Sequence, residues 1–179
     1  MPRLVLPTVR VHRSYLAAWD ELEPGDERWM GAYSFTEEQL SRAQIATPEG
    51  FAHLVAELKA QADPFRARLP HLVPMTSLWF VEHDEWLGRL SIRHELTPQL
   101  HELGGHIGYV VRPSARRKGY ATQMLEQSLP YAAKLGIDPA LVTCDEDNVA
   151  SRKVIEACGG EFDDNRHGKL RYWVATRTT

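Results

Sequence analysis

The sequence predicts a single α/β domain of the α+β type, in which helices flank a central sheet. The chain has 179 residues, of which 43% are hydrophobic and 25% charged, so it can bury one sizeable core and is too apolar to remain disordered. Its apolar residues follow strand-like and helix-like periods in turn. The resulting order is a strand, then helices, then β-β-β-α-β-α-β-β, without an internal repeat.

The N-terminal part is predicted to contain one strand and two helices. A short strand covers residues 4–6, and apolar side chains at helical spacing follow over residues 10–21. Thr47 is a good N-cap for a second helix over residues 48–62, which begins with proline. The prolines between residues 64 and 74 mark a packed loop and not, in our interpretation, a domain boundary.

The C-terminal part is predicted to alternate strands and helices, because the apolar period changes repeatedly between two and about 3.6 residues. Glycine and proline separate most of these segments, as is typical of turns. The segments are a hairpin over residues 77–96 that turns at 83–85, a strand over 105–112, a helix from near 117, a strand over 140–144, a helix over 148–158, and closing strands over 160–164 and 170–176.

Composition excludes several classes of protein. Lys and Arg total 21 against 24 Asp and Glu, a net charge of -3, so we expect no nucleic-acid partner. No apolar window approaches the roughly 18 residues of a membrane span, so we expect no membrane partner. The two cysteines and the lack of a signal-peptide pattern predict a cytoplasmic location. No His or Cys spacing fits a metal site, and we expect none.

The most informative stretch is the turn within residues 110–122, where a predicted strand runs into a helix. Such a turn presents unpaired backbone N–H groups at the positive end of the helix dipole, which suits a phosphate. Gly119 would allow close approach, and Arg116, Arg117 and Lys118 crowd positive charge where the dipole disfavours it unless an anion is bound. The turn predicts either a bound anion or a solvated basic loop.

Arg116-x-x-Gly119-x-Ala121, between a strand and a long helix, resembles the [Q/R]-x-x-G-x-[G/A] acetyl-CoA motif of the GNAT N-acetyltransferase superfamily. Further along, Asn148-x-x-Ser151 followed by two glycines resembles the N-x-x-S helix of that family. The resemblance implies a mixed, mostly antiparallel sheet that splays between its fourth and fifth strands.

The same resemblance implies how one domain over residues 1–179 would be organised. Residues 77–176 would form the cofactor-binding core, and residues 1–76 would roof the acceptor site. The aromatic and apolar group in that roof is Trp29, Met30, Tyr33 and Phe35.

Acetyl-CoA is the co-substrate that the resemblance implies, with its pantetheine arm lying in the splay and its pyrophosphate on the N–H groups of residues 117–122. Asn148 and Ser151 share one face of a helix start and could reach the pantetheine, although Asn148 also suits a helix cap. The predicted cofactor-binding residues are Tyr109, Val111, Arg116, Arg117, Lys118, Gly119, Tyr120, Ala121, Thr122, Asn148 and Ser151.

Acyl transfer to an amine needs an acceptor for the ammonium proton and a donor for the departing thiolate. Family members often place a tyrosine seven residues after the helix asparagine, but this chain has Ile155, which leaves water, Cys144 or Tyr109 as donors. His106 stands on the strand where the family often has a base, although strand alternation allows a structural role. The predicted catalytic residues are Tyr109 and His106, with His94, Glu95, His101 and Glu102 as alternative bases.

These expectations describe an acetyl-CoA-dependent N-acetyltransferase that passes an acetyl group directly to a primary amine. The acceptor is a small molecule or a peptide, and a homodimer is compatible with the sequence. The alternative is a non-catalytic acyl-CoA-binding module, which Ile155 favours.

Overall fold

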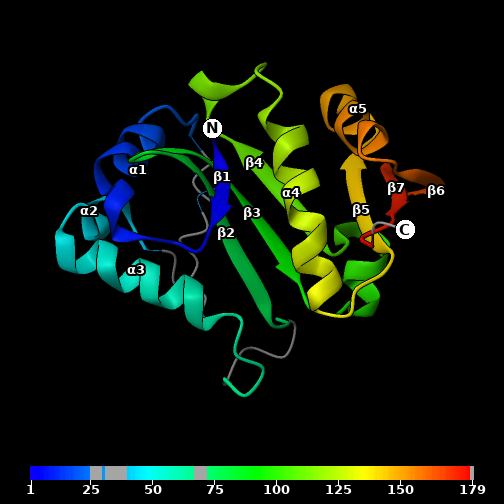
Figure 1. Cartoon of the computed structure of the whole chain (residues 1–179), viewed down its shortest axis with the longest axis horizontal. Helices are drawn as coiled ribbons and strands as arrows, with labels where there is room; N and C mark the ends of the chain where they lie inside the picture. The colour runs from blue at the N-terminus through cyan, green and yellow to red at the C-terminus, as the bar shows by residue number, and fades with distance from the viewer. Residues whose placement is uncertain (25–29, 31–39, 67–71, 178–179) are drawn as a thin grey trace.

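The computed structural model describes residues 1–24, 30, 40–66 and 72–177, and its strands form one seven-stranded sheet in the order β1-β2-β3-β4-β5-β7-β6 (Figure 1). Neighbouring strands are antiparallel except β4 and β5, which are parallel. The expected mixed, mostly antiparallel sheet is confirmed. The strands are β1 (Arg3–Val5), β2 (Met75–Glu82), β3 (Glu85–Arg93), β4 (Ile107–Val111), β5 (Ala140–Asp145), β6 (Glu161–Arg166) and β7 (Lys169–Val174).

Helices cover both faces of the sheet, as Figure 1 shows. Alternate residues of β2 point to opposite faces: Leu78 and Phe80 enter the core under α4, whereas Trp79 enters the core under α1 and α3. This alternation builds two apolar cores that hold the sheet between them. The helices are α1 (His12–Trp19), α2 (Arg42–Ile45) and α3 (Pro48–Ala60) on one side, and α4 (Tyr120–Lys134) and α5 (Val149–Ala157) on the other.

The sheet opens between β4 and β5. These strands share a single residue pair, Ile107 with Val142, whereas β5 and β7 are paired from Ala140–Val174 through Asp145–Lys169. Beyond Ile107 the two parallel strands therefore diverge, and the backbone edges that face the gap are not paired with each other. The expected splay between the fourth and fifth strands is confirmed.

Several element boundaries differ from the sequence-based expectations. The helix expected near Arg117 begins at Tyr120, because Arg117 and Gly119 have φ values of 66° and 75° that a right-handed helix does not allow. A 3-10 turn over Val9–Val11 precedes α1, and a π-helical turn η3 over Leu100–Gly104 precedes β4. Of the aromatic and apolar group expected in the roof, Met30 is buried, and Trp29, Tyr33 and Phe35 lie outside the described residues.

Candidate functional site

The glycine turn joins the end of β4 to the start of α4. In the described part of the chain, the backbone N–H groups of residues 117–122 have no hydrogen-bond partner, since the first bond of α4 runs from Gln123 N to Gly119 O at 3.2 Å. No side chain caps the helix, and a Cβ built on Gly119 would meet nothing within 4 Å. The turn is thus an open row of donors at a helix N-terminus, which suits an anion.

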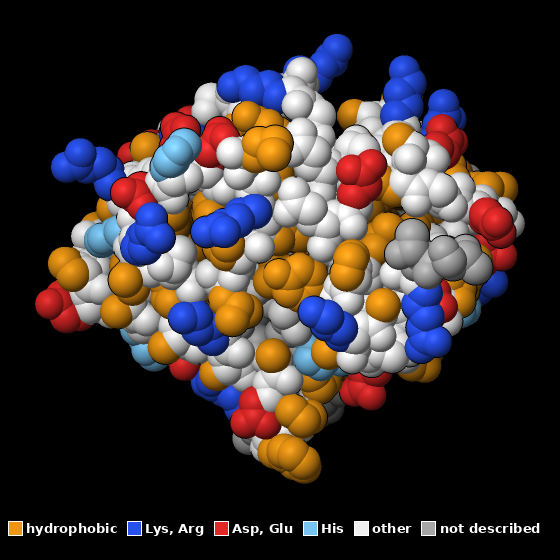
Figure 2. All heavy atoms as spheres, viewed as in Figure 1, with side chains coloured by type: hydrophobic (Ala, Val, Ile, Leu, Met, Phe, Trp, Pro, Cys, Tyr) orange, Lys and Arg blue, Asp and Glu red, His pale blue; other side chains and the backbone are white. Residues whose placement is uncertain are grey.

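Basic side chains surround this row of donors. Arg116, Arg117 and Lys118 are exposed, and Figure 2 shows Lys and Arg side chains projecting from the edge of the molecule where α4 begins. Arg116 also turns back, and its Nε donates to the carbonyl of Val111 at 3.2 Å. Tyr120, Ala121 and Thr122, in the first turn of α4, are half-buried.

Glu21 fixes the entrance to the turn, and sequence reasoning did not identify it. Its carboxylate accepts hydrogen bonds from Arg112 Nε at 2.7 Å, from the Ser114 backbone N–H at 3.0 Å and from Ser114 Oγ at 3.0 Å. It therefore ties the end of α1 to the end of β4, more than 90 residues away in the chain. No local sequence pattern indicates such a contact.

His106 lies at the vertex of the splay, which is the place where β4 and β5 meet at the Ile107–Val142 pair. Its backbone N–H donates to Leu141 O at 2.7 Å, and its imidazole Nδ1 accepts from the Leu141 N–H at 2.9 Å. The side chain thus takes the place of a backbone carbonyl one residue before the Ile107–Val142 pair, beyond which β4 and β5 diverge. Burial, followed by the charges of Arg93 and His101, lowers the pKa of His106 to about 4, so the ring is neutral and its proton sits on Nε2.

Tyr109 lies on β4, two residues after Ile107. Its side chain reaches α5 on the far side of the gap. Its hydroxyl is 2.7 Å from Ser151 Oγ. Burial raises the pKa of Tyr109 to about 12, so the phenol keeps its proton at neutral pH. The structure therefore brings the predicted residues Tyr109 and Ser151 into contact, and it places a phenol beside the gap although α5 carries none there.

The remaining predicted positions on α5 and β5 have ordinary structural partners. Asn148 is the N-cap of α5, because its side-chain oxygen accepts from the Ser151 N–H at 3.0 Å. Ile155 is fully buried in the core under α4 and α5. Burial raises the pKa of the Cys144 thiol, so this cysteine stays protonated as well.

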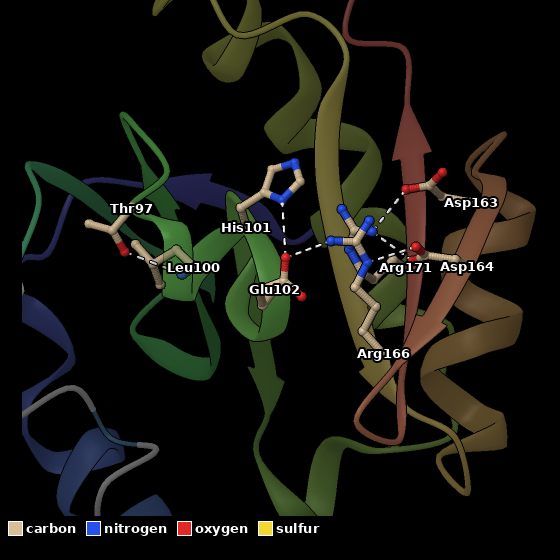
Figure 3. Close-up of polar contacts among 8 residues, drawn as sticks. All are labelled: Thr97, Leu100, His101, Glu102, Asp163, Asp164, Arg166 and Arg171. Carbon is tan, nitrogen blue, oxygen red and sulfur yellow. Dashed lines mark hydrogen bonds and ion pairs between the residues drawn. The ribbon is translucent and has the colours of Figure 1, made fainter.

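A network of ion pairs closes the side of the site formed by η3, β6 and β7 (Figure 3). Glu102 on η3 binds Arg166 Nη1 at 2.5 Å, and Arg166 Nε binds Asp164 at 2.7 Å. Arg171, which is fully buried, places Nη1 2.6 Å from Asp164 and 3.0 Å from Asp163. The network fastens η3, which leads into the vertex, to the last hairpin of the sheet.

Comparisons with known proteins agree with this geometry. The family model described as an acetyltransferase (GNAT) domain matches residues 28–161. The chain belongs to this family of acetyltransferases. A search of the curated proteins found no match.

Within the described residues, no helix is long and apolar enough to cross a membrane, and no three His, Cys, Asp or Glu side chains gather as at a metal ion.

Solved structures share the fold at low sequence identity. RimJ from Mycobacterium smegmatis, in complex with CoA-disulfide, has a TM-score of 0.62 and 17% identity over 96% of this chain and 80% of its own. The ribosomal-protein-S5-alanine acetyltransferase from Vibrio fischeri has a TM-score of 0.61 and 15% identity over 98% and 93%. RimL, a ribosomal L7/L12 alpha-N-protein acetyltransferase in complex with coenzyme A, has a TM-score of 0.58 and 16% identity over 96% and 92%.

The hydrogen bond from the Leu141 N–H to His106 Nδ1 predicts how the stability of the fold depends on pH. Because the pKa of His106 falls from 6.5 to about 4 on folding, the unfolded chain binds a proton between these values that the folded chain does not, so acidification through this window destabilises the fold. His106→Asn keeps an acceptor in the Nδ1 position and removes the titration. We expect its melting temperature to fall less than that of the wild type between pH 7 and pH 5.

His106→Leu serves as the control, because it leaves the Leu141 N–H unpaired. We expect it to be about 1–3 kcal/mol less stable than His106→Asn in urea unfolding. Equal pH dependence of the wild type and His106→Asn would contradict a neutral, bonded imidazole at the vertex.

Proposed function

We propose that this protein is an acetyl-CoA-dependent N-acetyltransferase that transfers the acetyl group directly to a primary amine. The observation that carries the proposal is the open row of N–H groups at residues 117–122, adjoining a strand that diverges from its parallel neighbour. Membership of the GNAT family supports it. The names of structural neighbours that act on ribosomal proteins favour the N-terminal amine of a protein or peptide as the acceptor.

The turn and the gap would bind the two ends of the co-substrate. The pyrophosphate would lie on the N–H groups of residues 117–122, where the helix dipole and Arg116, Arg117 and Lys118 favour negative charge. The pantetheine arm would run along the unpaired edge of β4 at Tyr109 and Val111, with the amide of Asn148 and the hydroxyl of Ser151 on the opposite wall. Residues 1–76, which contribute α1 and α3, would roof the acceptor on the other face of the sheet.

The chemistry would rest mainly on holding two substrates together in the gap. The amine nitrogen attacks the thioester carbonyl, its ammonium proton passes to water, and the carbon–sulfur bond breaks. The protonated phenol of Tyr109, which contacts Ser151 Oγ at 2.7 Å, would donate a proton to the departing thiolate and regain one from the water that took the ammonium proton. His106 would position the strands and would not act as a base while its Nδ1 lone pair is bonded to Leu141.

The alternative is a non-catalytic acyl-CoA-binding module. The observation in its favour is Ile155, which is fully buried where a tyrosine acid would stand on α5. The two functions separate in a single pair of measurements. An N-acetyltransferase shows a rise in melting temperature with acetyl-CoA and releases free thiol with an amine. A binding module shows the thermal shift alone, whatever peptide or small amine is offered.

We predict that Gly119→Val loses acetyl-CoA binding far beyond its effect on stability. At a φ of 75° a β-branched residue is strained by about 1–2 kcal/mol, and its side chain enters the space expected for the pyrophosphate. Gly136→Val is the matched control, because Gly136 has a φ of 78°, also meets nothing within 4 Å, and lies beyond the other end of α4.

The measurement is the shift in melting temperature on titration with acetyl-CoA, compared between the two variants. Both should melt earlier than the wild type by similar amounts, and only Gly119→Val should lose the shift. Normal binding by Gly119→Val would place the phosphate cradle elsewhere.

We also predict that Tyr109→Phe lowers turnover less than about 100-fold, since water can supply the proton that the phenol gives. Ser151→Ala, which keeps the phenol and removes its partner, should have the smaller effect. Steady-state release of thiol across pH should follow the pKa of the acceptor amine in all three proteins. A thousand-fold loss in Tyr109→Phe with unchanged cofactor affinity would identify a dedicated acid.

A further inference from the structure

Arg93 is a half-buried cation beside the vertex of the splay. It follows Ile92, whose side chain lies in the core under α4, so its own side chain lies on the opposite face of the sheet. Its backbone N–H donates to His106 O at 2.8 Å, which fixes Arg93 next to the vertex. The guanidinium is therefore on the face of the gap that α4 and α5 leave uncovered.

The guanidinium is bonded through one of its three nitrogens. Nη1 donates to Gly104 O at 3.3 Å and to Gly105 O at 3.1 Å, and these are its hydrogen bonds within the described residues. No carboxylate of those residues pairs with it. Burial lowers the pKa of Arg93, as expected of a partly desolvated cation.

The neighbouring arginines on this side of the sheet behave differently. Arg166 pairs with Glu102 and Asp164, and Arg171 pairs with Asp163 and Asp164 (Figure 3). Partly buried charges in folded proteins are normally paired in this way, because an unpaired charge loses its hydration without a replacement. Arg171 still keeps Nε and Nη2 without a partner, but it has its carboxylates, whereas Arg93 has none among the described residues.

The backbone of β4 carries no side chain at the position nearest to Arg93. Gly108, on β4, carries no side chain, and a Cβ built there would lie 4.0 Å from Arg93 Nη1 and 3.7 Å from Ser91 Oγ. Gly108 directly precedes Tyr109 on the strand that borders the gap. The guanidinium thus lies beside a stretch of backbone without a side chain, within one residue of the proposed reaction centre, and the nearby Ser91 hydroxyl is buried and donates to Gly108 O at 3.5 Å.

We propose that Arg93 binds a carboxylate of the acceptor, so that the enzyme acetylates amines that carry a carboxylate close to the amino group. This inference rests on the proposed N-acetyltransferase function. The Nε and Nη2 edge of a guanidinium bonds a carboxylate through two parallel N–H donors. The carboxylate is either the α-carboxylate of a free amino acid or an acidic side chain next to the N-terminus of a peptide.

The test compares acceptors that differ in one group. In one arm, free amino acids are compared with their carboxamides, and in the other, peptide amides with Asp at the second position are compared with the same peptides carrying Asn. Dissociation constants are measured by calorimetry, without and with CoA, and thiol release is measured in parallel with acetyl-CoA. The variants are Arg93→Gln and Arg93→Lys.

Arg66→Gln is the matched control, because Arg66 is similarly half-buried but is paired with Glu57 away from the gap. A charge-assisted bidentate bond predicts that the wild type prefers the carboxylate form by about 10-fold to 100-fold in one of the two arms. Arg93→Gln should abolish this preference. Arg93→Lys should retain only part of it, since lysine keeps the charge and loses the fork. Arg66→Gln should leave it unchanged.

Each outcome decides the inference. A wild-type preference near one in both arms, or a preference that survives in Arg93→Gln, overturns the carboxylate site. If Arg93→Gln does not fold, a ratio in Arg93→Lys equal to that of the wild type overturns it. A carboxylate preference without thiol release would sink the proposed transferase and leave the site standing. Thiol release that ignores the carboxylate would do the reverse.

Discussion

The architecture of the site depends on the point where β4 leaves β5. Parallel strands normally continue their ladder for several residues, but here the ladder ends after Ile107 and Val142. His106 stands on the other side of this pair, where its Nδ1 satisfies the Leu141 N–H that an earlier ladder pair would have bonded to a backbone carbonyl. The contact between the two strands can therefore be this short without leaving the Leu141 donor unpaired.

The two walls of the gap share the core under α4 and α5 but pair with different neighbouring strands. β4 is fastened to β3 and to the residues beneath α4, and Glu21 anchors its end through Arg112 and Ser114. β5 is fastened to β7 along its whole length, and the ion pairs of Glu102 and Arg166 brace the far hairpin against η3. Because neither wall relies on the other for pairing, the gap stays open while the surrounding sheet remains rigid. An open gap between rigid walls is what positions two substrates without a folding step.

Sequence predicted the parts of this arrangement that follow from local chemistry. The strand, the glycine turn and the helix after it were visible because Gly119 and the basic residues around it form a compact pattern, and Asn148 is recognisable as a helix cap. The contacts of Glu21 and the bond from His106 to Leu141 were not visible, because each joins segments far apart in the chain and depends on the final register of the sheet. Strand alternation allowed a structural role for His106 but did not identify its partner, Leu141.

The charge of Arg93 and the neutral state of the His106 side chain are linked by one electrostatic constraint. Arg93 stands beside His106, and after burial it is the next largest cause of the lowered pKa of that histidine. Burial and this cation together keep His106 neutral, so that Nδ1 remains an acceptor and the Leu141 bond persists. The same cation would be stabilised by an anionic group arriving from the acceptor side. In the proposed recognition of a carboxylate, the charge that lowers the pKa of His106 is therefore the same charge that the acceptor would neutralise.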